Sequence, residues 1–404
     1  MLTAVTLDTI QTAREIVRQS ARKTPLISSH SCSERFGFPV YFKLESLQRT
    51  GSFKIRGASY KLAKLAADPD SPRAVMAISA GNHAQGVALA SRYNGFQATI
   101  FMPENAPLSK IQATRSYGAE VICTGQTFDE ARQHAMAWLD QHPVTFISPF
   151  DDDDIIAGQG TCALELLEQL PELETVVVPV GGGGLMGGMA IALKALKPGI
   201  RIIGVQTEAV PSLVESWRQG RLIEPIPRPT IADGIAIKKP AQRNLEILQA
   251  HVDEMLTVSE EAISRALFYA IQYKHMIVEG AGAVGLAALL EGMVESKGPT
   301  AVVISGGNMD VKLLDSVINK GMNDNGRFLI FKTLINDSPG SLKQVLNLLA
   351  EHKANVLHIE HARFRSTIPL NQTEIEVEIE TRDAAHAEAI LAGLQQAGYR
   401  TQQL

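Results

Sequence analysis

The 404-residue sequence predicts an α/β fold with parallel sheets, followed by a smaller α+β domain. Short β-rich runs alternate with helical patterns from about residue 41 to about residue 310. Several of these runs are almost continuously apolar, as parallel strands buried on both faces are. Beyond residue 327 the order becomes strand, helix, strand, strand, helix, strand, which is typical of the split ferredoxin-like arrangement.

In the first domain, strands are followed by helices in a regular order. The expected pairs are 74–79 with 82–93, 98–103 with 108–118, 120–125 with 129–142, and 144–150 with 162–170. Further strands are expected at 175–180, 201–208 and 301–307. Ligands of open α/β sheets bind at the carboxyl ends of the strands, so the turns after these strands are where functional residues are expected.

The second domain is expected to contain strands 327–335, 354–364 and 372–380, helices 338–352 and 383–398, and a short last strand. The preceding stretch GMNDNGR, residues 321–327, is rich in turn-forming residues and predicts a linker. We therefore expect a first domain over residues 1–322, with a smaller subdomain at roughly 50–150, and a second domain over residues 327–404.

Composition favours a small-molecule partner. The net charge is -5 and no block of lysines and arginines stands out, so neither nucleic acid nor an anionic membrane is indicated as a partner. No segment approaches the ~20 apolar residues that span a bilayer. The three cysteines are far apart and form no CxxC pair, which favours reduced thiols and a cytoplasmic location.

The strongest anion-binding signal is a run of glycines between an apolar strand and a helix. Glycine lets backbone approach a ligand closely, and the N–H groups of a helix start favour an anion. The run consists of Gly181, Gly182, Gly183 and Gly184, followed by Leu185. A dinucleotide site is an alternative, because Gly182, Gly184 and Gly187 satisfy GxGxxG and Glu208 ends the next strand. The other alternative is a tight turn that binds no ligand.

Lys54 lies in an apolar setting, GSFKIRG, where a helix is expected to begin. Burial and the helix dipole disfavour the ammonium form there, so the pKa of Lys54 should fall. A neutral amine can add to an aldehyde. The alternative is a side chain whose stem passes Phe53 and carries its charge to water.

Polar turns follow two other expected strands. In the first, backbone donors suit a carboxylate and Asn82 can donate to a phenolic or enolic oxygen, although an ordinary helix cap by Ser79 or Asn82 is the alternative. This turn reads Ser79, Ala80, Gly81, Asn82, His83, and the other reads Ser305, Gly306, Gly307, Asn308. Such turns together with a phosphate site predict one ligand cleft.

The motifs SFKIRGA, SAGNHAQG, the glycine run after TVVVPV, and SGGN, in this order, resemble those of the threonine dehydratase (threonine ammonia-lyase) family. The resemblance covers nearly all of residues 1–322 and implies the second fold type of pyridoxal-phosphate enzymes, with open parallel-sheet subdomains. The tail, with NDSPGSL after its first strand, resembles an ACT domain, a small amino-acid-sensing module.

The resemblance also implies a role for each motif residue. Lys54 would hold pyridoxal 5'-phosphate covalently and act as general base, with Phe53 beside the ring. Asn82 would donate to the ring oxygen, and Ser305 would face the ring nitrogen. Gly181, Gly182, Gly183, Gly184 and Leu185 would hold the phosphate. Ser79 and the amides of Ala80, Gly81, Asn82 and His83 would take the substrate carboxylate, with Glu279 and Asp233 as further candidates lining the cleft.

The implied reaction converts L-threonine to 2-oxobutanoate and ammonia by α,β-elimination, with L-serine to pyruvate as a second reaction. A serine racemase and a 3-hydroxyaspartate ammonia-lyase of the same fold are alternatives. Racemases of this family carry a serine at the position of Ala80, which makes racemisation doubtful here. Their metal cluster is only partly matched, by Glu208, so we expect that carboxylate to be structural or solvated.

Other functional classes are an NAD-linked oxidoreductase built on the GxGxxG pattern and a non-catalytic amino-acid sensor. The presence of Lys54, Asn82 and Ser305 together argues against a non-catalytic sensor. An amino-acid effector of the ACT domain would bind near Asp337, Gly340 and Asn355. Edge strands of a small sheet favour pairing with a second subunit, so we expect a homo-oligomer, either dimer or tetramer.

Overall fold

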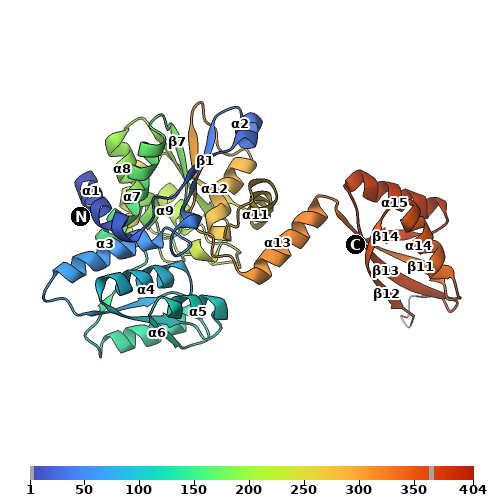
Figure 1. Cartoon of the computed structure of the whole chain (residues 1–404), viewed down its shortest axis with the longest axis horizontal. Coiled ribbons are helices and arrows are strands. Elements are labelled where there is room, and N and C mark those ends of the chain that lie inside the picture. The colour runs from blue at the N-terminus through green and yellow to red at the C-terminus, as the bar shows by residue number, and fades with distance from the viewer. Residues whose placement is uncertain (1–3, 364–367) are drawn as a thin grey trace. The chain divides into compact units, whose positions relative to one another are not determined.

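The computed structural model describes residues 4–363 and 368–404. The chain divides into compact units, and the division falls between Asp310 and Val311 (Figure 1). The first unit contains the expected parallel sheets, and the second is the small α+β unit.

The large sheet of the first unit has the strand order β1-β2-β10-β7-β8-β9. β1 (Leu26–Ser28) runs antiparallel to β2 (Val40–Leu44), whereas the other neighbours are parallel. The remaining strands are β7 (Thr175–Pro179), β8 (Arg201–Thr207), β9 (Glu254–Val258) and β10 (Thr300–Ile304). Every residue of β7 and β10 is buried, as their apolar sequences predict.

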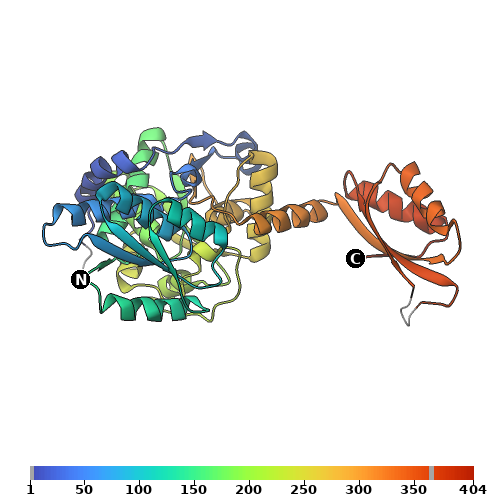
Figure 2. The ribbon, with the colours of Figure 1, turned by 60° about the horizontal axis from the view of Figure 1, so that its bottom comes forward.

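The small sheet has the order β5-β4-β3-β6, with all neighbours parallel. Its strands are β3 (Ala74–Ile78), β4 (Gln97–Met102), β5 (Glu120–Cys123) and β6 (Thr145–Phe146). Along β3, Val75 and Ala77 belong to the large core with residues of α4 (Asn82–Asn94), whereas Met76 and Ile78 pack with Ala135 of α6 (Phe128–Leu139). Both faces are therefore covered by helices (Figures 1 and 2).

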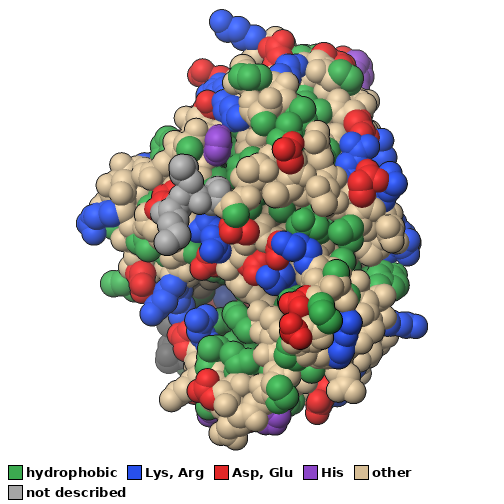
Figure 3. All heavy atoms as spheres, turned by 90° about the vertical axis from the view of Figure 1, so that its left-hand side faces the viewer, with side chains coloured by type: hydrophobic (Ala, Val, Ile, Leu, Met, Phe, Trp, Pro, Cys, Tyr) green, Lys and Arg blue, Asp and Glu red, His purple; other side chains and the backbone are tan. Residues whose placement is uncertain are grey.

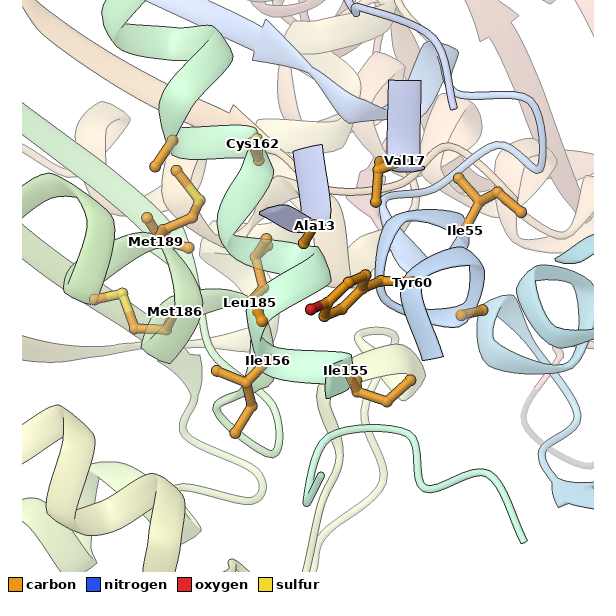
Figure 4. Packing of buried hydrophobic residues seen from close by; sticks show 14 of the residues in the cluster. Ala13, Val17, Ile55, Tyr60, Ile155, Ile156, Cys162, Leu185, Met186 and Met189 are labelled. Carbon is orange, nitrogen blue, oxygen red and sulfur yellow. The ribbon is translucent and has the colours of Figure 1, made fainter. Parts of the chain in front are cut away.

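A group of helices packs between the sheets of the first unit. Figure 4 shows Val17 of α1, Tyr60 of α3, Ile155 of α7 and Leu185 of α8 in one cluster. A Cβ atom at Gly158 would lie 2.6 Å from Gly57 Cα, so α7 and α3 approach closely only because glycine is present. The other helices of this unit have these bounds: α1 (Leu7–Ser20), α2 (His30–Phe36), α3 (Lys54–Ala67), α5 (Leu108–Ser116), α7 (Asp153–Gln169), α8 (Gly184–Leu196), α9 (Ser212–Gln219), α10 (Gln242–His251), α11 (Glu260–Lys274), α12 (Gly280–Leu290), and the 3-10 turns η1 (Glu45–Leu47) and η2 (Asp233–Ile235).

The second unit has an antiparallel sheet in the order β12-β13-β11-β14. Leu329, Phe331 and Ile375 from the sheet pack with Val345 and Ile390 from its helices. Its elements are α13 (Val311–Asp324), β11 (Phe328–Asn336), α14 (Ser341–Glu351), β12 (Asn355–Ala362), β13 (Gln372–Glu380), α15 (Ala384–Gln396) and β14 (Thr401–Gln403). This is the expected ferredoxin-like arrangement, although Phe364, at the end of one expected strand, lies outside the described residues.

The expected linker at residues 321–327 is wrong for most of its length. Helix α13 continues to Asp324, and a turn with Gly326 at φ 64° follows. Val317 and Gly321, one helical turn apart, are both buried, and Asn325 donates to the Gly321 carbonyl at 2.7 Å. Packing of this helical face outweighs the turn preference of the Gly, Asn and Asp residues.

Basic and acidic side chains are interspersed over the face shown in Figure 3. Within residues 4–363 and 368–404, no helix has both the length and the apolar character that crossing a membrane requires.

Candidate active site

Lys54 begins helix α3, as the sequence predicts. The residues before it are tied to the turn after β10: Ser52 forms an isolated β-bridge with Gly306, and Phe53 N–H donates to the Ser305 carbonyl at 3.2 Å. The lysine and the Ser305 turn therefore lie side by side, although about 250 residues separate them in the sequence.

The Lys54 amine lies inside the site. Its Nζ atom donates to the Pro149 carbonyl at 2.9 Å and lies 5.1 Å from the centre of the Phe53 ring. Burial lowers the pKa of Lys54 to about 8, and the carboxylate of Glu279 partly opposes this shift. A substantial fraction of the amine is therefore neutral near physiological pH and available as a nucleophile or base.

The glycine run forms a buried turn between β7 and α8. Gly183 has φ 90° and precedes the helix, which begins at Gly184. Within the described parts of the chain, no acceptor bonds the backbone N–H groups of Gly182, Gly183, Gly184 or Leu185. Unpaired N–H groups at a helix start suit a phosphate.

The glycine turn is held by neighbours that the sequence patterns did not reveal. Asn244 of α10 donates to the Gly182 carbonyl at 2.6 Å and to the Phe150 carbonyl at 3.2 Å. A Cβ atom at Gly182 would overlap the Phe150 ring. Because Phe150 follows Pro149, which accepts from Lys54, this segment joins the lysine to the glycine turn. Asn244 lies in an ordinary amphipathic helix and carries no motif.

The turn after β3 leads into α4. Gly81, with no side-chain hydrogen bond, is the capping residue, so neither Ser79 nor Asn82 caps the helix. Ser79 Oγ instead accepts from Gly81 N–H at 3.2 Å. His83 is buried, and its Nε2 lies 2.9 Å from the Ile147 carbonyl oxygen. Burial, together with the nearby Lys54 charge, lowers the pKa of His83 to about 3, so the imidazole is neutral and packs as a structural group.

Asn82 and Glu279 are in direct contact. Asn82 Nδ2 donates to Glu279 Oε1 at 2.6 Å, and Asn82 Oδ1 accepts from Asn308 Nδ2 at 2.7 Å. Burial, and secondly the charge of Asp233, raises the pKa of Glu279 to about 7. Asp233 itself is largely exposed and pairs with Lys110 at 2.9 Å, so it acts on the site from its edge.

Ser305 follows β10 and is buried. Its hydroxyl makes no hydrogen bond to any residue within 4–363 and 368–404. The hydroxyl oxygen is not among the fully sequestered unpaired oxygens of the described residues, so it remains accessible to a ligand. Its neutral character suits a heterocyclic nitrogen better than a cation.

Other expected residues lie apart from this group. Glu208 is exposed, and the described residues contain no cluster of His, Cys, Asp and Glu side chains that suits a metal ion. In the second unit, Asp337 contacts Arg363 at 3.4 Å, Gly340 precedes α14 with φ 93°, and Asn355 begins β12.

We expect the Lys54 amine of the cofactor-free protein to react with an amine-directed reagent with a midpoint near pH 8, because only the neutral amine is nucleophilic. Mass spectrometry of the Lys54 peptide across a pH series measures it. Lys64 on the same helix is an internal control, since its hydrogen bond to Asp154 raises its pKa. Glu279→Gln should move the Lys54 midpoint to lower pH. A Lys54 midpoint near 10.5, the ordinary value, would contradict the geometry.

Comparison with known proteins places these features in a family. The family of pyridoxal-phosphate dependent enzymes matches residues 17–306, which include Lys54, the glycine turn and Ser305. The chain belongs to this family. It is 46% identical over 395 residues to an L-threonine ammonia-lyase of Thermotoga maritima, covering 98% of each chain. It is 44% identical over 324 residues to a catabolic L-threonine dehydratase of Staphylococcus aureus, covering 79% of this chain and 93% of that one.

Solved structures give the same family. Maize serine racemase is similar with a TM-score of 0.74 and 33% identity, covering 80% of this chain and 99% of that one. The processed form of threonine deaminase isoform 2 from Solanum lycopersicum is similar with a TM-score of 0.73 and 34% identity, covering 79% and 91%. The expected fold class is thus confirmed, and pyridoxal phosphate is the cofactor of this family.

The residues present fit that cofactor. The unpaired N–H groups of the glycine turn suit its phosphate, the Lys54 amine suits its aldehyde, and the Ser305 hydroxyl suits its ring nitrogen.

Proposed function

We propose that the protein is an L-threonine ammonia-lyase that converts L-threonine to 2-oxobutanoate and ammonia and also accepts L-serine. The observation that carries the proposal is the position of Lys54, half-buried between the glycine turn and the Ser305 turn. The names of the relatives support threonine as the substrate. Water is lost from the β-carbon and regained on hydrolysis, so the net change is release of ammonia.

In the proposed reaction the protein's groups have separate tasks. Phe53 packs near the cofactor ring. Neutral Lys54 Nζ removes the proton from the substrate α-carbon, and its depressed pKa matches that task. The backbone donors of the turn after Ser79 hold the substrate carboxylate, which fixes the α-proton toward Lys54. When bound, the cofactor supplies an electron sink at the α-carbon.

Ser305 places a neutral hydroxyl, not a carboxylate, at the expected ring nitrogen. Without a permanent negative charge there, a protonated ring is not favoured and charge on the α-carbon is short-lived. Loss of the β-hydroxyl is then favoured over transamination.

A serine racemase is the second candidate function, because maize serine racemase has a closely similar fold. A racemase needs an acid or base on the face of the α-carbon opposite Lys54. The methyl side chain of Ala80 has no proton to give, so elimination is favoured over racemisation.

We propose that the second unit is an ACT domain. The first unit would then be the catalytic domain and the second the regulatory domain. Its βαββαβ order and antiparallel sheet support this. The proposal includes an amino-acid effector near Asp337, Gly340 and Asn355, and assembly into a homo-oligomer. A cytoplasmic location is also proposed, supported by Cys32, Cys123 and Cys162, which are free thiols within the described residues.

Turnover of the cofactor-loaded protein tests the proposed function. We expect 2-oxobutanoate from L-threonine, a lower rate of pyruvate formation from L-serine, and no D-serine. Formation of D-serine faster than pyruvate would support the racemase instead. Turnover of 3-hydroxyaspartate, with none of L-threonine or L-serine, would assign 3-hydroxyaspartate as the substrate. Adding isoleucine or valine to the threonine assay tests the regulatory domain.

A further inference from the structure

Asn82 belongs to a line of hydrogen bonds that joins distant segments of the first unit. Asn308 Nδ2 donates both to the Thr50 carbonyl oxygen at 2.8 Å and to Asn82 Oδ1 at 2.7 Å. Asn82 Nδ2 donates to Glu279 Oε1 at 2.6 Å. The line runs from the backbone before α3, through the Asn308 side chain, to the residue that precedes α12. We call these residues, Thr50, Asn308, Asn82 and Glu279, the Asn82 relay.

The ends of the relay determine its direction. An amide can be turned either way, because rotation by half a turn exchanges its donor and its acceptor. The Thr50 carbonyl only accepts, so Asn308 must present its NH₂ group there, and the same group reaches Asn82 Oδ1. Asn82 then accepts on oxygen and turns its NH₂ group toward Glu279. The opposite rotation would set oxygen against oxygen at Glu279 and NH₂ against NH₂ at Asn308.

Glycines leave room for both ends of the relay. A Cβ atom at Gly51, where φ is 70°, would overlap the Asn308 amide. A Cβ atom at Gly306 would overlap Glu279 Oε1. Each glycine thus admits a polar side chain into space that any other residue would fill, and the relay is packed on both sides.

We propose that Asn308 and Glu279 are positioning residues for Asn82, holding its amide so that one N–H is bonded to Glu279 and the other stays free to donate to the ring oxygen of the cofactor. This inference rests on the cofactor placement proposed above. A donor held in advance loses no free energy to reorganisation when its partner arrives. An Asn82 amide without the relay would populate both rotations, and only one of them donates.

The decisive variant is Asn308→Asp, which keeps the side-chain shape but replaces the NH₂ group with an oxygen. That oxygen would face the Thr50 carbonyl and Asn82 Oδ1, and Asn82 is expected to turn away from its donating rotation. We expect a shifted absorption band of bound pyridoxal phosphate and about tenfold weaker cofactor binding, as loss of one hydrogen bond to a charged oxygen implies. Titration of the cofactor-free protein with pyridoxal phosphate measures both.

Asn94→Asp is the control, because it makes the same Asn-to-Asp change at the end of α4, the helix that Asn82 begins; within the described residues the Asn94 side chain bonds to the Ala90 carbonyl and to no member of the relay. Glu279→Leu is a second variant that removes the acceptor at the other end of the relay, and it should shift the band in the same way. Thermal unfolding of each cofactor-free variant reports whether it folds, so either variant suffices for the test.

A double-mutant cycle separates positioning from general damage. In an Asn82→Ala background, Asn308→Asp should change neither the band nor the affinity further, because its effect passes through Asn82. An equal loss in both backgrounds, or an unchanged band in both Asn308→Asp and Glu279→Leu, would overturn the relay alone. A wild-type protein that binds no pyridoxal phosphate would overturn the cofactor placement and the relay with it.

Discussion

Lys54→Ala is expected to abolish 2-oxobutanoate production, with a loss of at least about 10³-fold in kcat, because the substitution removes both the proposed covalent attachment point and the proposed base. His83 is not expected to replace it, because the imidazole is buried and its Nε2 lies against the Ile147 carbonyl oxygen. The measurement is 2-oxo acid formation from L-threonine in the presence of excess pyridoxal phosphate.

Lys54→Arg separates charge from nucleophilicity. The guanidinium keeps a positive charge but does not become neutral, so this variant should be as inactive as Lys54→Ala. Lys64→Ala, on the exposed side of the same helix, should retain the wild-type rate. Borohydride reduction followed by mass spectrometry should place the cofactor mass on the Lys54 peptide of the wild type. Activity above about a tenth of wild type in Lys54→Ala would contradict the assignment of Lys54 as the base, because loss of a general base is expected to lower the rate by a far larger factor.

Arg56→Met is expected to destabilise the first unit by about 3–5 kcal/mol, the range measured when one partner of a buried ion pair is removed. Arg56 is completely buried and binds Glu45 through Nε at 2.7 Å and Glu165 through Nη1 at 2.7 Å. Lys43, also buried, bonds to Glu165 at 2.9 Å. Without the guanidinium, Glu45 would remain a buried carboxylate with far too little compensating charge.

The buried ion-pair group links four elements around the first turn of the helix that carries Lys54. Its members are Lys43 of β2, Glu45 of η1, Arg56 of α3 and Glu165 of α7. Loss of Arg56 should therefore also loosen the position of Lys54 and weaken cofactor binding. Urea unfolding measured on the cofactor-free protein isolates the stability effect. Arg92→Met, at an exposed position of α4, is the control and should change stability by less than about 0.5 kcal/mol. A loss below about 1 kcal/mol for Arg56→Met would mean that water or rearrangement compensates the carboxylates.

The same group contributes a pH dependence. Arg56 and Lys43 hold the pKa of Glu45 below its ordinary value of 4.5 despite burial, which acts in the other direction. A carboxylate with a lowered folded-state pKa stabilises the protein above its unfolded pKa, and this contribution is lost as the pH falls through the folded value. Arg56→Met should therefore flatten the acid side of the stability profile below about pH 4.5.

Local patterns were sufficient for the apolar strands and for the turns at their ends. The apolar runs predicted the buried strands β7 and β10, and the setting of Lys54 predicted a lowered pKa at a helix start. These features depend on residues close in sequence, and hydrophobic periodicity and helix-end chemistry act over a few residues. The ordinary turn preferences failed at residues 321–324, where burial of one face of α13 outweighed them.

What only the tertiary structure decided are the contacts between side chains far apart in the chain. Asn82 and Glu279 are separated by 197 positions, and Asn308 and Asn82 by 226, so no local pattern relates them. Asn244 under the glycine turn and Glu165 beside Arg56 lie in helices whose sequences satisfy ordinary amphipathic packing. The sequence by itself determined which residues stand at the strand ends and helix starts where the proposed chemistry is placed. Folding decided their protonation and orientation, because burial and hydrogen-bond partners set both, and these exist only once distant strands and helices are packed together.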